Sequence, residues 1–406
     1  MRPTPFIQRL RQLWFAAFAL SLFAHSTFGQ QKLEKDFDLQ IQLDNRYYLH
    51  PGLYQGQERN YFSISLNPEY LLEWDDGKKS VKASLFGRWD QYDDHRTHFD
   101  IRELYYQNNK RNLEWSIGWK KIFWGVTESI HLVDIINQTD QVESFDGEQK
   151  LGQPMLHISY PTNKGTFDFF YMPYARRRQF PDRGGRLRFS NVIEREDIKI
   201  ENNWGEWTPS VAFRWSHYFG PMDIGVSQFY GVGREPLFLG LDGSREFRAI
   251  YPTISQTGVD AQATLGPWLL KLESIYRYAD EQDFLALATG FEYTFGNIAS
   301  SGLDIGIVGE YLYDSRDELA FSNLANDLFV GARFAFNDTQ STDFLAGAIF
   351  DLDNSSKFFS VEGSRRIGDS WKVEVEARIF QDVSKEEFFY NFREDSFLQL
   401  RFSKFF

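Results

Sequence analysis

The chain contains no cysteine among its 406 residues, which excludes a disulfide framework and any thiolate metal site. Beyond the N-terminal region, no stretch approaches the roughly 18 consecutive apolar residues that a transmembrane helix needs. No segment rich in proline, serine or glycine divides residues 31–406. We therefore expect one continuous domain over residues 30–406.

Residues 1–29 have the pattern of a secretory signal peptide. Three arginines precede the apolar stretch Leu13–Ala24, and small residues follow it at Thr27 and Gly29. The apolar stretch is too short to cross a bilayer as a helix. The sequence therefore predicts export, with cleavage before Gln30.

Acidic residues outnumber basic ones, and the net charge of the chain is −13. Cleavage of the predicted signal peptide removes Arg2, Arg9 and Arg11 and no acidic residue, which takes the charge to −16. A chain this acidic is a poor match for nucleic acid, so we expect no nucleic-acid partner.

What the chain does have is alternation of apolar and polar side chains, most regular at residues 371–379. There the polar residues are Lys372, Glu374, Glu376 and Arg378, and the residues between them are all apolar. The pattern recurs well over a dozen times, with aromatic residues concentrated at the ends of the apolar face. It accounts for a mean hydropathy of −0.46 in a chain that is 42% hydrophobic and 17% aromatic. This combination is typical of an all-β transmembrane barrel that faces lipid outside and water inside.

The alternating segments and the turns between them predict an antiparallel up-and-down barrel of about eighteen strands, with sixteen as the alternative count. Gly, Asn and Asp mark short turns at every second connection, as at Asp75-Asp76-Gly77 and Gly368-Asp369. Three of the remaining connections are long, near 122–151, 175–207 and 231–255. The expected strands are 37–48, 61–75, 79–91, 97–107, 111–121, 152–160, 165–174, 208–217, 221–230, 256–266, 267–278, 283–296, 301–313, 327–337, 342–352, 356–367, 370–382 and 395–405.

The last strand carries a family resemblance. The chain ends in Phe406, with Leu398, Leu400 and Phe402 at alternate positions before it. This ending resembles that of bacterial outer-membrane β-barrels, whose final strand pairs with the first. The resemblance implies a Gram-negative outer-membrane location, with membrane lipid and lipopolysaccharide as partners. Lys404 departs from the family pattern, which usually has an apolar or aromatic residue there.

A second, more local resemblance covers a strand and the loop after it. The segment Ile117–Gly125, followed in the loop by Asp134, Asn137 and Asp140, is similar to a segment of alginate-export-type porins and related outer-membrane channel families. Trp124-Gly125 would turn the chain inward from the strand end, and apolar residues of the loop would pack inside the wall. An outer loop capped by its own hydrophobic cluster is the alternative. The candidate constriction residues are Trp124, Gly125, Asp134, Asn137 and Asp140.

Arginines are concentrated in one long connection, within a window of twenty residues where only Asp182 and Glu194 oppose them. If this loop enters the lumen, its guanidinium groups would favour anionic solutes. If it lies outside, they would bind lipopolysaccharide phosphates. The cluster consists of Arg176, Arg177, Arg178, Arg183, Arg186, Arg188 and Arg195.

Two other patterns predict no chemistry. His157-Ile158-Ser159 has the His-x-Ser spacing of outer-membrane phospholipases, but Tyr160-Pro161 follows where those enzymes have Asn-Gly. His95 and His98 lie among aspartates with no ligand spacing, so we expect no metal there. No cofactor motif is present.

An eighteen-stranded barrel is wide enough for an aqueous lumen. The sequence therefore favours a porin, not an enzyme, that passes small polar solutes by passive or facilitated diffusion, with anionic solutes as candidates. The alternatives are a barrel plugged by its loops that acts as a surface-binding protein or adhesin, an exporter of a charged polymer, and an outer-membrane lipid hydrolase.

Overall fold

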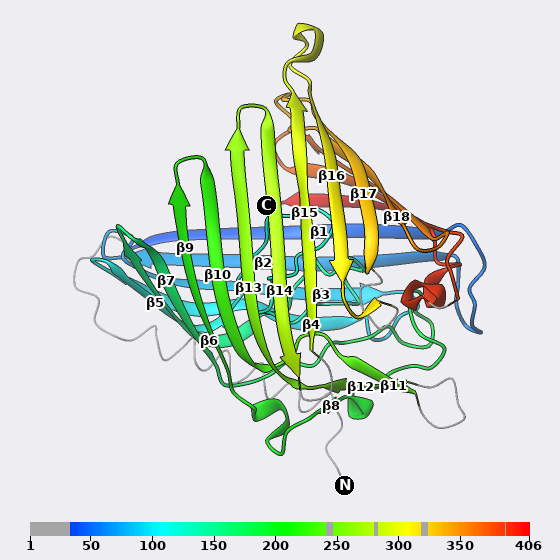
Figure 1. Ribbon diagram of the computed structural model, residues 1–406, viewed down its shortest axis with the longest axis horizontal. Helices are drawn as coiled ribbons and strands as arrows, with labels where there is room; N and C mark the ends of the chain where they lie inside the picture. Colours follow the sequence, from blue (N-terminus) through cyan, green and yellow to red (C-terminus); the bar gives the residue numbers. More distant parts are fainter. Residues whose placement is uncertain (1–32, 241–246, 280–282, 318–323, 386) are drawn as a thin grey trace.

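The computed structural model describes residues 33–240, 247–279, 283–317, 324–385 and 387–406. Within these residues, eighteen antiparallel strands form one closed sheet, in which each strand pairs with its neighbours and β1 pairs with both β2 and β21 (Figure 1). The predicted signal peptide, residues 1–29, lies outside the described residues. No helix in the described part of the chain is long and apolar enough to cross a membrane.

The wall strands are β1 (Glu34–Tyr48), β2 (Asn60–Trp74), β3 (Lys79–Asp90), β4 (His98–Lys110), β5 (Leu113–Lys120), β6 (Gln153–Thr162), β7 (Gly165–Met172), β9 (Ser210–Phe219), β10 (Met222–Val232), β13 (Thr253–Leu265), β14 (Trp268–Ala279), β15 (Phe284–Phe295), β16 (Asp304–Asp314), β17 (Asn326–Ala335), β18 (Asp343–Asp351), β19 (Lys357–Ile367), β20 (Trp371–Gln381) and β21 (Phe397–Phe405). The predicted count of eighteen is confirmed, and each predicted strand end lies within three residues of the observed one.

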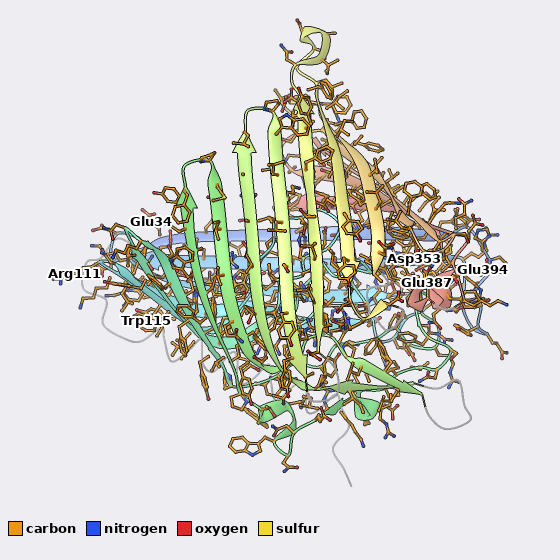
Figure 2. All side chains as sticks on the ribbon, viewed as in Figure 1. Glu34, Arg111, Trp115, Asp353, Glu387 and Glu394 are labelled. Atoms are coloured by element: carbon orange, nitrogen blue, oxygen red, sulfur yellow. The ribbon has the colours of Figure 1, made fainter. Side chains whose placement is uncertain are left out.

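The connections define two rims. The short-turn rim carries the tight connections, such as those after β9 and β13, which lie toward the top of Figure 1. The long-loop rim carries a second, three-stranded sheet of β8 (Lys199–Ile200), β11 (Leu237–Gly240) and β12 (Phe247–Tyr251). Short 3-10 helices also lie in connections: η1 (Arg195–Asp197), η2 (Gly205–Trp207), η3 (Ile298–Ser300) and η5 (Phe388–Phe392). Figure 2 shows the two rims by their labelled side chains, with Glu34, Arg111 and Trp115 at one and Asp353, Glu387 and Glu394 at the other.

Burial confirms the two faces of the strands. On β14, Lys271, Glu273 and Arg277 are buried, whereas Trp268 and Tyr276 on the opposite face are exposed. Because the inward side chains are polar and the outward ones apolar, the wall is polar toward the lumen and apolar toward its surroundings.

A β-bulge in β4 explains the position of Glu103, which strict alternation would place on the apolar face. Glu103 pairs with Ser84 and Ile101 with Leu85, so Arg102 is the extra residue between them. The bulge turns Glu103 toward the lumen, where its carboxylate forms an ion pair with Lys82 at 2.6 Å.

Lys404 departs from the family pattern without disrupting the closing strand. Its ammonium group lies 4.9 Å from the ring centroid of Trp371 and donates a hydrogen bond to the Ser370 hydroxyl at the short-turn rim. The Lys404 stem can therefore lie on the outward face while the charge reaches the polar rim.

Candidate functional site

The connection between β5 and β6, residues 121–152, folds into the barrel and is called the inner loop below. The Glu273 carboxylate on β14 accepts hydrogen bonds from the backbone amides of Val126 at 2.7 Å and Thr127 at 3.0 Å. It also accepts bonds from the Thr127 hydroxyl at 2.7 Å and from the Val133 amide at 3.2 Å. A buried wall carboxylate thus satisfies backbone donors that would otherwise be stranded in the lumen.

Glu310 on β16 holds the next part of the inner loop in the same way. Its carboxylate accepts bonds from the amides of Glu128 at 2.7 Å and Ser129 at 2.9 Å, and from the Ser129 hydroxyl at 2.6 Å. Glu128 then forms an ion pair with Arg333 on β17 at 2.6 Å. The inner loop, which starts at the end of β5, is therefore bonded to β14, β16 and β17.

The apolar residues of the inner loop pack inside the wall, as the sequence predicts. Val133 and Ile136 are fully buried, in a cluster that includes Phe170, Phe229 and Ile275 from wall strands. The alternative interpretation, an outer loop capped by its own hydrophobic cluster, is wrong because this cluster is made with the wall.

Trp124 and Gly125 form the inward bend of the inner loop. Trp124 is buried, with the Arg214 guanidinium 5.0 Å from its ring centroid. Gly125 has a φ of +153°, and a Cβ there would lie 2.7 Å from His131 Nδ1 and 3.2 Å from Glu273 Oε1. Only glycine fits this bend without strain. Burial disfavours the His131 cation, but the Glu273 carboxylate outweighs that effect and raises the pKa of His131.

The three polar candidates hold the base of the inner loop. Asn137 joins the two ends of the inner loop, because its side-chain amide donates hydrogen bonds to the carbonyl oxygens of Lys120 at 2.9 Å and Leu151 at 2.8 Å. Asp134 accepts from the Trp124 amide and forms an ion pair with Lys150 at 3.1 Å. Its pKa is raised by burial.

Asp140 fastens the inner loop to β4. Its carboxylate accepts a bond from Arg102 at 2.6 Å. Burial opposes ionisation of Asp140, but Arg102 outweighs burial and lowers the pKa to about 2. Together, the five candidate residues shape and anchor the inner loop.

The tip of the inner loop reaches β20. Asp146 forms an ion pair with Arg378 at 2.6 Å, and Phe145 lies among the rings of Phe358, Phe380 and Phe392. The negative charge of Asp146, together with burial, raises the pKa of the nearby Glu148 to about 7.

A cavity of about 290 Å³ lies between the inner loop and strands β14–β20. Its apolar wall includes Phe329, Leu345 and Ile349. Its basic lining residues are Lys150, Arg178, Arg234, Arg277, Arg316 and Arg378, and its acidic ones are Glu128, Asp134, Asp146, Glu148, Glu235, Asp314 and Glu362.

Several of these charges neutralise one another at the cavity wall. Glu235 bridges Arg277 at 2.7 Å and Arg316 at 2.6 Å. Arg234 differs, because its guanidinium donates to the backbone carbonyls of Ile136 and Val232. No ion pair to Arg234 is recorded within the described residues, and burial lowers its pKa to about 10.

The seven arginines of the predicted basic cluster are spread over different environments. Arg178 lines the cavity and donates to the Arg234 carbonyl at 2.9 Å. Arg176 bonds Asp100 at 2.6 Å, Arg177 pairs with Glu206 at 3.2 Å, and Arg183 is exposed. Arg195 also pairs with Glu206, at 2.9 Å. Of the seven, only Arg178 lines this cavity.

Arg186 and Arg188 are structural. Arg186 is buried and bonds Asp395 at 2.6 Å, which joins the connection after β7 to the one before β21. Arg188 donates to the carbonyls of Phe189, Ser190 and Arg183. Both guanidinium groups are therefore used within the loops.

The His157–Ser159 pattern is part of the wall. The His157 ring lies 2.8 Å from Asp168 and stacks on Phe170 at a centroid distance of 4.3 Å. These contacts fix the ring against the neighbouring strand β7.

Strand alternation indicates which way the residues that hold the inner loop face, but not what they do. Alternation identifies Glu273, Glu310 and Arg378 as inward-facing. Their task could not be seen from the sequence, since their partners in the inner loop are more than a hundred residues away.

No protein-family model matches the chain, and no curated protein matches it. Solved structures do resemble its fold. A BenF-like porin from Pseudomonas fluorescens Pf-5 aligns with a TM-score of 0.54 at 10% identity, over 92% of this chain and 98% of that one. Pseudomonas aeruginosa OccK5 (OpdH) aligns with a TM-score of 0.52 at 9% identity, over 92% and 97% of the two chains.

Escherichia coli Wzi also aligns, with a TM-score of 0.51 at 10% identity, over 91% of this chain and 84% of that one. Wzi is described as a carbohydrate-binding β-barrel involved in group 1 capsule assembly. At these identities the likeness shows a shared barrel fold.

Proposed function

We propose that the chain is a Gram-negative outer-membrane channel for diffusion of small polar solutes, exported by a cleaved signal peptide. The observation that carries the proposal is the inner loop, which Glu273 and Glu310 fasten across the lumen beside a cavity of about 290 Å³. Fixed charges at a narrow passage select solutes by sign and size. In this proposal the inner loop is the constriction, and outward residues such as Trp268 and Tyr276 contact membrane lipid and lipopolysaccharide.

Purified, refolded protein in planar bilayers tests this proposal. A channel gives discrete, ohmic current steps, and liposome swelling with sugars, amino acids and carboxylates then ranks the solutes. Protein that shows heat-modifiable migration on gels, and is therefore folded, but carries no current at any voltage would contradict the proposal.

An anionic preference is a finer part of the proposal and rests on Arg178 and Arg234 at the cavity wall. Arg178→Ser should move the reversal potential toward that of cations, because it removes fixed positive charge from a poorly screened passage. Arg177→Ser is the matched control, since Arg177 pairs with Glu206 and does not line the cavity. Equal reversal potentials in Arg178→Ser and wild type would contradict the anionic preference alone.

A second candidate function is a surface-binding barrel plugged by its loops. The packed network at the long-loop rim favours it: Arg88 pairs with Glu143 at 2.9 Å, Arg96 pairs with Asp90 at 2.7 Å, and all four are buried. The resemblance to Wzi adds carbohydrate as a ligand class to test. Absence of current together with saturable binding of an acidic polysaccharide would favour this function.

A further inference from the structure

Two connections at the long-loop rim bring three metal-ligating side chains together. His95 lies in the connection between β3 and β4, whereas Asp182 and Glu194 lie in the connection after β7. One His95 ring nitrogen and one carboxylate oxygen from each acid lie within 4.8 Å of one another. These residues belong to neither the inner loop nor the lining of the large cavity.

The contacts of His95 fix which nitrogen is available as a ligand. Nδ1 lies 2.8 Å from the Phe180 carbonyl oxygen, and a carbonyl only accepts, so Nδ1 carries the hydrogen. In the neutral ring, Nε2 then points a lone pair toward the Glu194 carboxylate, 3.4 Å away. Two acceptors facing each other form no hydrogen bond, whereas a cation between them would bind both. Metal-ligating histidines commonly donate their other N–H to a backbone carbonyl in this way.

The buried carboxylate of Asp93 positions the backbone of two of these residues. Its Oδ1 accepts from the amide of His95 at 3.0 Å and from the amide of Asp182 at 3.0 Å. Gly185 allows the approach, since a Cβ there would lie 2.3 Å from Asp93 Oδ2. For the Asp182 side chain, no hydrogen bond or ion pair is recorded to any residue that the structure describes. The Asp182 carboxylate is thus held near His95.

We propose that His95, Asp182 and Glu194 form a divalent transition-metal site that joins the two connections, with Zn²⁺ as its best-matched ion. One imidazole nitrogen and two carboxylate oxygens suit Zn²⁺, with water completing a tetrahedral shell. The sequence predicts no metal here because the acids next to His95 and His98 have no ligand spacing. The acids that converge on His95 come instead from a distant part of the chain, and His98 faces Asp140 at 3.6 Å.

The test uses the folded, full-length protein in detergent, stripped of metal, and a chromogenic chelator that competes for Zn²⁺. Wild type should bind one equivalent of Zn²⁺ saturably, and His95→Gln and Asp182→Asn should each weaken binding roughly tenfold or more. His50→Gln is the matched control, since His50 is an exposed histidine at the same rim outside the cluster, and it should bind like wild type. Heat-modifiable migration confirms that each variant is folded.

X-ray absorption of zinc-loaded wild type gives a second readout that needs no variant. The proposed site predicts a single imidazole among nitrogen and oxygen ligands. No saturable binding, unchanged affinity in both variants, a shell without imidazole, or displacement of Zn²⁺ by equimolar Ca²⁺ would each overturn the proposal.

Discussion

Glu273 on β14 accepts two hydrogen bonds from Thr127, one from the backbone amide at 3.0 Å and one from the hydroxyl at 2.7 Å. Bonds to an ionised carboxylate are stronger than those between neutral groups. The path of the inner loop is therefore set by a charge on the facing wall as well as by the sequence of the loop.

Replacing Glu273 with Ala should release the bend of the inner loop. The variant leaves the backbone amides of Val126, Thr127 and Val133 without their acceptor, which should cost about 3 kcal/mol or more locally. The Thr127 hydroxyl can still donate to the Ile130 carbonyl. We expect noisier single-channel current and faster proteolysis of residues 121–152. Glu292→Ala is the control, because Glu292 also faces the lumen but accepts no bond from the inner loop. Current noise and proteolysis equal to those of the control would contradict the role of Glu273.

Gly125→Ala should distort the same bend by sterics alone. Its φ of +153° disfavours alanine, and the new methyl group would displace His131. We expect a changed conductance with a barrel that still migrates as folded. Gly296→Ala, where the nearest atom to a Cβ is 3.5 Å away, should conduct like wild type. A Gly125→Ala conductance within the wild-type range would argue against the tight bend.

The charge of the cavity should change near neutral pH. Because the pKa of Glu148 is raised to about 7, chiefly by Asp146, Glu148 is neutral below about pH 6 and negative above about pH 8. His131, whose pKa is also raised, gains positive charge in the same direction as pH falls. Anion permeability relative to cations should therefore rise on acidification, as measured by reversal potentials.

Glu148→Gln isolates the contribution of Glu148 to this pH dependence. The variant should show a smaller change in reversal potential between pH 8 and pH 6 than wild type. If wild type and Glu148→Gln have the same pH dependence, Glu148 does not titrate in the passage.

Arg186→Met should destabilise the long-loop rim and leave ion selectivity unchanged. The substitution strands the buried Asp395 carboxylate, and breaking one side of a buried pair costs about 3–5 kcal/mol. A lower denaturant midpoint with an unaltered reversal potential is the expected result. A shift in reversal potential would instead place Arg186 in the permeation path.

Much of the barrel could be predicted from the sequence because strand periodicity is local. The alternation around Lys271 and Glu273 fixes which side chains face the lumen, and the tight turns fix every second connection. The bulge at Arg102 could be suspected only from Glu103 on the wrong face. The ion pair of Arg186 could not be predicted, since its partner Asp395 lies in a loop that is distant in the sequence.

Because the chain contains no cysteine, single introduced cysteines can test directly whether the lumen beside the inner loop is a water-filled passage. Ser360 on β19 lines the cavity, and the adjacent Val361 points to the opposite face of the strand. A single cysteine at each position, treated with a charged, water-soluble thiol reagent during single-channel recording, separates the two faces. If the passage is water-filled, the reagent should lower the current of Ser360→Cys and leave that of Val361→Cys unchanged. No change in Ser360→Cys, with the thiol shown by mass spectrometry to be modified, would contradict a water-filled passage.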